Sequence, residues 1–135
     1  QEPTNSPSVF NFYRPEYKAP GLLTQNNLAG PVFQITDSYS SISLPNKLWS
    51  IVEEGFSYWH AYSFPLDLSA ETALAATPEM LVDHLNTLFC AGGMNLNTRN
   101  IILANLVQIP ADQPEARARV AVYLVMTSPE GAVMK

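Results

Sequence analysis

The side chains suited to catalysis or metal binding are few. The chain contains two histidines, His60 and His84, and one cysteine, Cys90. Asp83 precedes His84, but adjacent residues on a helix project about 100° apart, so the pair lacks the i, i+3 or i+4 spacing of a helical metal site. No Cys/His cluster has zinc spacing, and no Gly-rich phosphate loop or Gly-x-Ser-x-Gly turn is present. The sequence therefore predicts no metal and no cofactor, and it leaves open whether the protein is an enzyme.

An aromatic cluster between residues 56 and 64 is the strongest constellation in the chain. Stacked rings with nearby polar groups can bind a carbohydrate or another flat ligand, and the candidate ligand-binding residues are Tyr58, Trp59, His60 and Tyr62. The alternative is that the rings pack an irregular segment against the helices, because bulky aromatics bury much area. Both interpretations stay open on the sequence.

The composition narrows the class of protein. The chain has 135 residues, 47% of them apolar, which is enough for one domain with a core and argues against disorder. The formal net charge of −5 argues against a general nucleic-acid binder. No apolar run reaches the roughly 20 residues of a membrane-spanning helix. The lone Cys90 lies in an apolar stretch and is expected to be a buried structural thiol.

The two halves of the chain differ in pattern, and together they predict an all-α fold. Residues 1–35 read as an irregular aromatic and proline-rich segment, with a short helix over 22–28. Residues 36–135 read as mainly helical. The first long helix ends at Gly55 and is either kinked or divided at Pro45. We expect a single domain, 1–135, built as an irregular bundle of about four or five helices.

Three further helices are expected in the second half. One opens at Thr77-Pro78 and ends before Gly92, the next is capped by Asn97, and the last long one opens at Pro114 and should be the buried central helix. A short terminal helix is expected to open at residues 128–130. The expected inward residues are Leu81, Leu85, Leu88 and Phe89 on the first of these helices and Ile102, Leu103, Leu106 and Val107 on the second.

Several stretches of the chain carry a resemblance to a known family. The pattern resembles that of the Domain of Unknown Function 1800 family, in the same order along nearly the whole chain, although residues 56–76 and 131–133 depart from it. The matching stretches are SVFNFYRPEY (8–17), PG (20–21), PVFQI (31–35), LVDHLN (81–86), TR (98–99) and VAVYLVMTSPE (120–130).

The resemblance implies a position in a larger protein. Members are much longer and mostly helical, so the chain would be a C-terminal domain or fragment of an exported bacterial protein, consistent with its start at Gln1. The implied partners are the N-terminal part of the parent and a sulfatase-like protein of the Domain of Unknown Function 1501 family, while the excised domain could form a homodimer.

Three functions are compatible with this position. The resemblance supplies no catalytic residues, and it favours a structural or protein-interaction role. The first alternative is the aromatic carbohydrate- or ligand-binding surface. The second is a share in a hydrolase site that the N-terminal portion completes, with His60, Asp83 and His84 as its residues.

Overall fold

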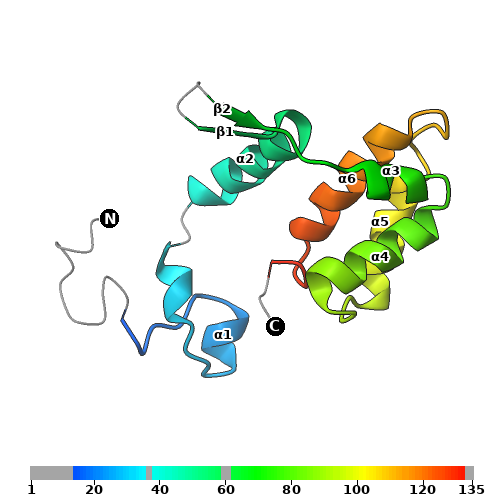
Figure 1. Ribbon diagram of the computed structural model, residues 1–135. Helices are drawn as coiled ribbons and strands as arrows, with labels where there is room; N and C mark the ends of the chain where they lie inside the picture. Colours follow the sequence, from blue (N-terminus) through cyan, green and yellow to red (C-terminus); the bar gives the residue numbers. More distant parts are fainter. Residues whose placement is uncertain (1–13, 36–37, 59–61, 133–135) are drawn as a thin grey trace. The chain divides into compact units, whose positions relative to one another are not determined.

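The fold is predominantly α-helical in the computed structural model, which describes residues 14–35, 38–58 and 62–132 (Figure 1). This confirms the all-α expectation. The only sheet in these ranges is a two-stranded hairpin. The elements are α1 (Leu22–Gln25), the 3₁₀ helix η2 (Pro31–Ile35), α2 (Ser40–Glu54), β1 (Phe56–Tyr58), β2 (Tyr62–Phe64), α3 (Ser69–Leu74), α4 (Pro78–Cys90), α5 (Leu96–Leu106) and α6 (Pro114–Met126).

The chain divides into two compact units, Gln1–Leu44 and Pro45–Lys135. In the first unit, the backbone N–H of Gly30 donates to the Tyr17 carbonyl at 2.8 Å and closes the chain around the single turn of α1. The expected short helix over 22–28 is therefore present but shorter. The second unit contains the helical bundle. The expectation of one domain over 1–135 stays a prediction.

Helix α2 is continuous through Pro45, so the sequence alternative of two separate helices is wrong. Proline removes one backbone donor, and its ring restricts the preceding turn. The helix ends where predicted, at Gly55, whose φ of +85° suits glycine. Near this end, the rings of Trp49 and Tyr123 meet edge to face at 5.3 Å and join α2 to α6.

The core of the second unit surrounds α6, which packs against α3, α4 and α5. This confirms the expected central helix, and it follows from an apolar sequence with little polar face. Cys90 is 1% exposed, as expected. No helix in the described ranges is long and apolar enough to span a membrane. The buried apolar residues of the core are Val52, Ala75, Leu81, Val82, Leu85, Cys90, Ile102, Leu106, Ala121, Val122 and Val125.

The predicted inward face of α4 is only half right. Leu81 and Leu85 are fully buried, but Leu88 is 59% exposed and Phe89 is 40% exposed. The buried face of α4 also contains Val82 and Cys90. Asn86 lies between these two residues, four positions from each. The side chain of Asn86 accepts a hydrogen bond from the Met94 backbone at 3.0 Å. Because Asn86 is polar, the apolar periodicity of the sequence does not indicate this face.

Three other local expectations are corrected. Helix α5 is capped by Asn95, whose side chain accepts from the Thr98 backbone at 2.9 Å, and the expected cap Asn97 lies inside the helix. Val107, the residue directly after this helix, is 63% exposed rather than inward. Residues 128–132 form turns rather than a terminal helix, because the Ser128 hydroxyl donates to the carbonyl of Val125 and closes the chain back on α6. The short helix α3 was not expected at all.

Candidate functional site

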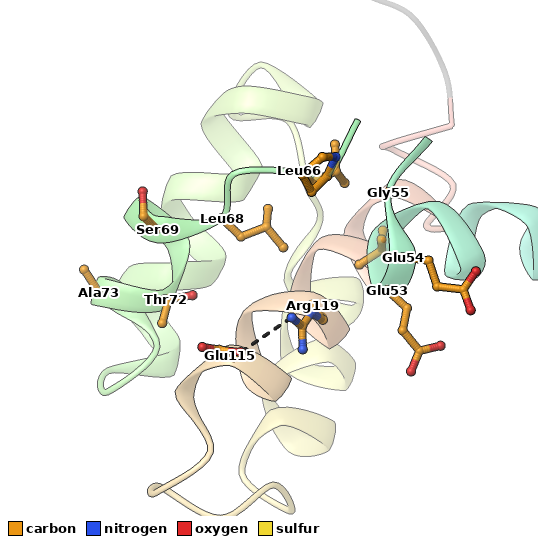
Figure 2. A pocket seen from close by; sticks show the side chains of 12 residues that line it. Glu53, Glu54, Gly55, Leu66, Leu68, Ser69, Thr72, Ala73, Glu115 and Arg119 are labelled. Atoms are coloured by element: carbon orange, nitrogen blue, oxygen red, sulfur yellow. Dashed lines mark hydrogen bonds and ion pairs between the residues drawn. The ribbon is translucent and has the colours of Figure 1, made fainter. Parts of the chain in front are cut away.

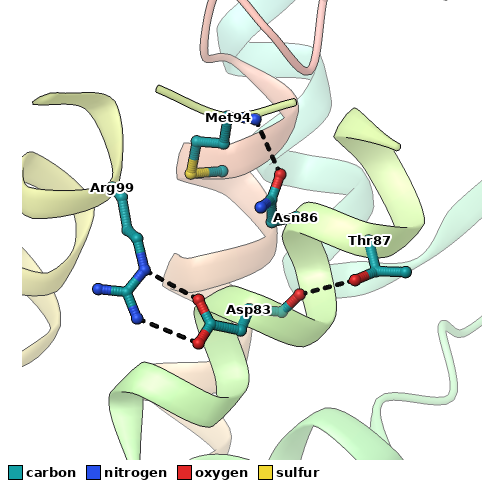
Figure 3. Close-up of polar contacts among 5 residues, drawn as sticks. All are labelled: Asp83, Asn86, Thr87, Met94 and Arg99. Carbon is teal, nitrogen blue, oxygen red and sulfur yellow. Dashed lines mark hydrogen bonds and ion pairs between the residues drawn. The ribbon is translucent and has the colours of Figure 1, made fainter. Parts of the chain in front are cut away.

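Asp83, a sequence candidate for hydrolysis, forms a bridge between two helices (Figure 3). Its two carboxylate oxygens accept from Nε and Nη2 of Arg99 at 2.8 and 3.1 Å, which ties α4 to α5. The hydrogen bond from Arg99 lowers the pKa of Asp83, and the same pair raises the pKa of Arg99. The carboxylate of Asp83 therefore has a structural partner on the neighbouring helix.

His84 makes a second bridge on the same helix. Its Nε2 lies 3.2 Å from Oε1 of Glu71, whose side chain is 12% exposed, so this pair links α4 to α3. Adjacent residues on α4 thus point to different neighbours, as their angular separation predicts. The third hydrolase candidate, His60, lies outside the described residues, so nothing in the structure brings the three together.

A third polar contact joins the end of the chain to α5. The Glu130 carboxylate accepts from the backbone and side-chain amides of Asn95, and from the Thr98 hydroxyl at 3.3 Å. A negative charge is favourable at a helix N-terminus. Burial opposes ionisation of Glu130, but the hydrogen bonds outweigh it and lower its pKa. Sequence reasoning missed this role, because only the fold brings residues 95 and 130 together.

A buried arginine was also missed. Arg117 is 8% exposed, and its guanidinium donates to the Ile109 carbonyl at 2.7 and 2.9 Å and to the Ala75 carbonyl at 3.2 Å. It therefore fixes the ends of α3 and α5 to α6. In the described part of the chain, no group of three or more His, Cys, Asp or Glu side chains is arranged to hold a metal ion.

The aromatic candidates lie at the hairpin. Antiparallel register pairs Phe56 with Phe64 and Tyr58 with Tyr62. Trp59 and His60 lie outside the described residues. The rings of Phe56 and Phe64 are 47% and 60% exposed. The base of the hairpin therefore presents two rings to solvent, which the strand register brings side by side.

A cleft of about 600 Å³ opens beside the base of this hairpin (Figure 2). We call it the α2–α3 cleft. Its walls come from the end of α2, the chain leaving β2, α3 and the first turns of α6, and its volume lies within the roughly 300–1,000 Å³ of ligand sites. The lining residues are Val52, Glu53, Glu54, Gly55, Pro65, Leu66, Leu68, Ser69, Thr72, Ala73, Glu115 and Arg119.

The cleft combines an apolar wall with charged groups. In Figure 2, Leu68 and Arg119 face the same space, and Glu54 is directed away from it. Arg119 donates to the Glu115 carboxylate at 3.5 Å, a long contact between side chains that are 40% and 71% exposed. Such a pair contributes little to stability. The arrangement leaves the guanidinium able to donate to a ligand.

Comparisons with protein-family models, with curated proteins and with solved structures find no match to this chain.

Proposed function

We propose that this chain is a structural and protein-interaction domain of a larger protein, resembling the C-terminal portion of the Domain of Unknown Function 1800 family. The observation that carries the proposal is the division of roles among its side chains. The polar groups of the family-like stretches bind one another, as in Asp83 with Arg99 and Thr98 with Glu130. Large apolar side chains are left at the surface, and such groups are typical of interaction sites.

The interaction face that we assign is the connection between α4 and α5, with Leu88, Phe89 and Leu96 (76% exposed) around it. We call these three residues the α4–α5 apolar end. Its occupant in this proposal is the N-terminal part of the parent protein. Export from a bacterial cell and a sulfatase-like partner of the Domain of Unknown Function 1501 family belong to the same proposal, and they rest on the resemblance.

The test is association of the 135-residue chain with the remainder of its parent, produced as a separate polypeptide. We expect a complex on size-exclusion chromatography that the double substitution L88S/F89S abolishes. Met80→Ser is the matched control, because Met80 is 57% exposed at the opposite end of the same helix. A complex that survives L88S/F89S, or the absence of any complex with the unsubstituted chain, would refute the proposal.

A second candidate function is ligand binding by the aromatic hairpin. It is favoured by the strand register, which brings Phe56 and Phe64 together beside the α2–α3 cleft. A neighbouring pair of exposed rings is a suitable stacking surface. The hydrolase alternative keeps His60, Asp83 and His84 as its residues. It predicts that alanine at all three abolishes the function of the full-length protein in vivo.

A further inference from the structure

The α2–α3 cleft shares no residue with the α4–α5 apolar end, so it is available for a separate role. The carboxylates of Glu53, Glu54 and Glu115 line it against the guanidinium of Arg119, which leaves the lining with a net charge of −2. Arg119 is already in contact with Glu115, so the excess charge lies on Glu53 and Glu54 at the end of α2. Glu54 is directed outward, but its charge still acts on the cleft, because physiological salt screens charges over about 8 Å.

The helix ends at the cleft add to this negative charge. Residues 52–55 line the cleft, so the negative end of the α2 dipole lies in its wall, and the last turn of α2 contains no basic residue. The positive ends of α3 and α6 each have an acidic neighbour, because the Asp67 carboxylate accepts from the Ser69 backbone and Glu115 lies in the first turn of α6. The hydrogen bonds with Ser69 lower the pKa of Asp67 and keep it ionised. A cationic ligand group would therefore supply the charge that the end of α2 lacks.

The remaining wall of the cleft is apolar. Leu66 is 45% exposed and Leu68 is half-buried, and Leu68 faces the same space as Arg119 (Figure 2). A side chain at Gly55 would place its Cβ 2.5 Å from the Phe64 carbonyl oxygen, so glycine lets the chain that leads to Leu66 pass close to the end of α2. Negative charge and apolar surface are therefore neighbours in the cleft. The side chains of lysine and arginine combine a charged head with an apolar stem and match both.

The occupant of the cleft must also bring a hydrogen-bond acceptor. Arg119 has five N–H donors and, among the described contacts, uses one of them in the long bond to Glu115. A protonated polyamine or a bare metal ion offers no acceptor to this guanidinium. A peptide offers both groups, since its basic side chain can pair with Glu53 and its backbone carbonyls can accept from Arg119. The charges of the cleft therefore favour a basic peptide over a small cation.

We propose that the α2–α3 cleft binds a basic segment of a partner polypeptide. The stem of a lysine or arginine lies along Leu66 and Leu68, its charged end lies beside Glu53 and the end of α2, and a neighbouring backbone carbonyl accepts from Arg119. The inference goes beyond the proposed function, because it adds a second interaction surface and the chemistry of its partner. The formal net charge of −5 steers a basic partner toward this chain.

The test selects ligands for the whole 135-residue chain from a random octapeptide library displayed on phage. We expect the selected sequences to share a lysine or arginine beside an apolar residue. The affinity of the best peptide, measured by calorimetry, should fall as salt is added. Glu53→Gln should weaken binding about 3- to 10-fold through the lost ion pair, and Leu66→Ser should weaken it through lost apolar contact. Glu79→Gln is the matched control for Glu53→Gln, since Glu79 is exposed on α4 outside the cleft, and it should leave binding unchanged.

Four results would overturn the inference. The first is a selection that yields no peptide, or peptides without a shared basic residue. The second is binding that both Glu53→Gln and Leu66→Ser leave intact, which would place the peptide elsewhere. The third is spermine binding as tight as that of the peptide, which would assign the cleft to a small polyamine. The fourth is loss of peptide binding in L88S/F89S, which would move the peptide to the α4–α5 apolar end. Peptide binding unchanged in L88S/F89S is the expected result, so this inference and the proposed function can fail separately.

Discussion

At the scale of single residues, the buried guanidinium of Arg117 joins α6 to the ends of two other helices. It supplies three hydrogen bonds to the carbonyls of Ile109 and Ala75, which close the ends of two other helices. We predict that Arg117→Met lowers the free energy of unfolding by about 2–4 kcal/mol, because buried acceptors lose charged donors. Urea titration followed by far-UV circular dichroism measures the change.

The matched control for this prediction is Arg119→Met, two residues along α6 and 40% exposed. It removes the same charge from the same helix, and it should change stability by less than about 0.5 kcal/mol. Equal losses in the two variants would mean that charge or helix propensity, rather than the carbonyl contacts, explains the effect of Arg117.

The pKa values of two carboxyl groups predict how the free energy of unfolding depends on pH. The pKa values of Asp83 and Glu130 lie below their usual 3.8 and 4.5 in the folded state. The unfolded chain therefore takes up protons first as the pH falls. The stability that these groups contribute is present above the usual values and is lost as the pH drops through the lowered ones.

The measurement is the midpoint of urea unfolding across the acidic range. D83N and E130Q should each flatten the fall in stability below about pH 5. Asp112→Asn, at an exposed residue before α6, removes the same charge and should keep the full slope. If stability falls with pH as steeply in D83N and E130Q as in the unsubstituted chain, then the contacts with Arg99 and Thr98 contribute no measurable stability in solution.

At the scale of elements, the two faces of α4 give a sharp comparison. Leu85 is fully buried and Leu88 is 59% exposed, although both fit the same apolar stripe in the sequence. We predict that Leu85→Ala costs about 2–5 kcal/mol of unfolding free energy through lost burial and a cavity. Leu88→Ala should cost less than about 0.5 kcal/mol, as measured by thermal unfolding. A similar loss of unfolding free energy in both variants would mean that Leu88 is buried, as the sequence predicts.

The predictable elements are those that local chemistry specifies. Proline at the first position opens α4 and α6 as expected, and Gly55 ends α2. Helix α3 has only six residues, too few to display a period. Its start is marked instead by the Asp67 carboxylate, which accepts from the Ser69 backbone at 3.0 Å. An aspartate two residues before a serine is a turn signal that the sequence itself contains.

Contacts between distant parts of the chain could not be predicted from one sequence. Asn95, which caps α5, also donates to Glu130, and the two residues are 35 positions apart in the sequence. The burial of Arg117 depends on two loop carbonyls. The α2–α3 cleft likewise unites residues from three separate stretches, 52–55, 65–73 and 115–119. Of this site, the sequence indicated only the neighbouring aromatic residues.

At the scale of the whole molecule, the buried core belongs to one unit. In the described part of the chain, every buried apolar residue of the core lies between Val52 and Val125. The polar bridges at Asp83, Glu71 and Arg117 also lie within this stretch. A unit with its own core and its own polar contacts is expected to fold independently.

We therefore predict that a fragment of residues 38–135, which keeps all of α2, unfolds in one cooperative transition. The contact of Trp49 with Tyr123 should give the fragment the near-ultraviolet circular dichroism of an ordered aromatic pair. A control fragment of residues 56–135 lacks α2, and with it Trp49 and the buried Val52, so it should melt at a lower temperature. A gradual, non-cooperative transition of 38–135 would show that residues 1–37 are needed for the bundle to fold.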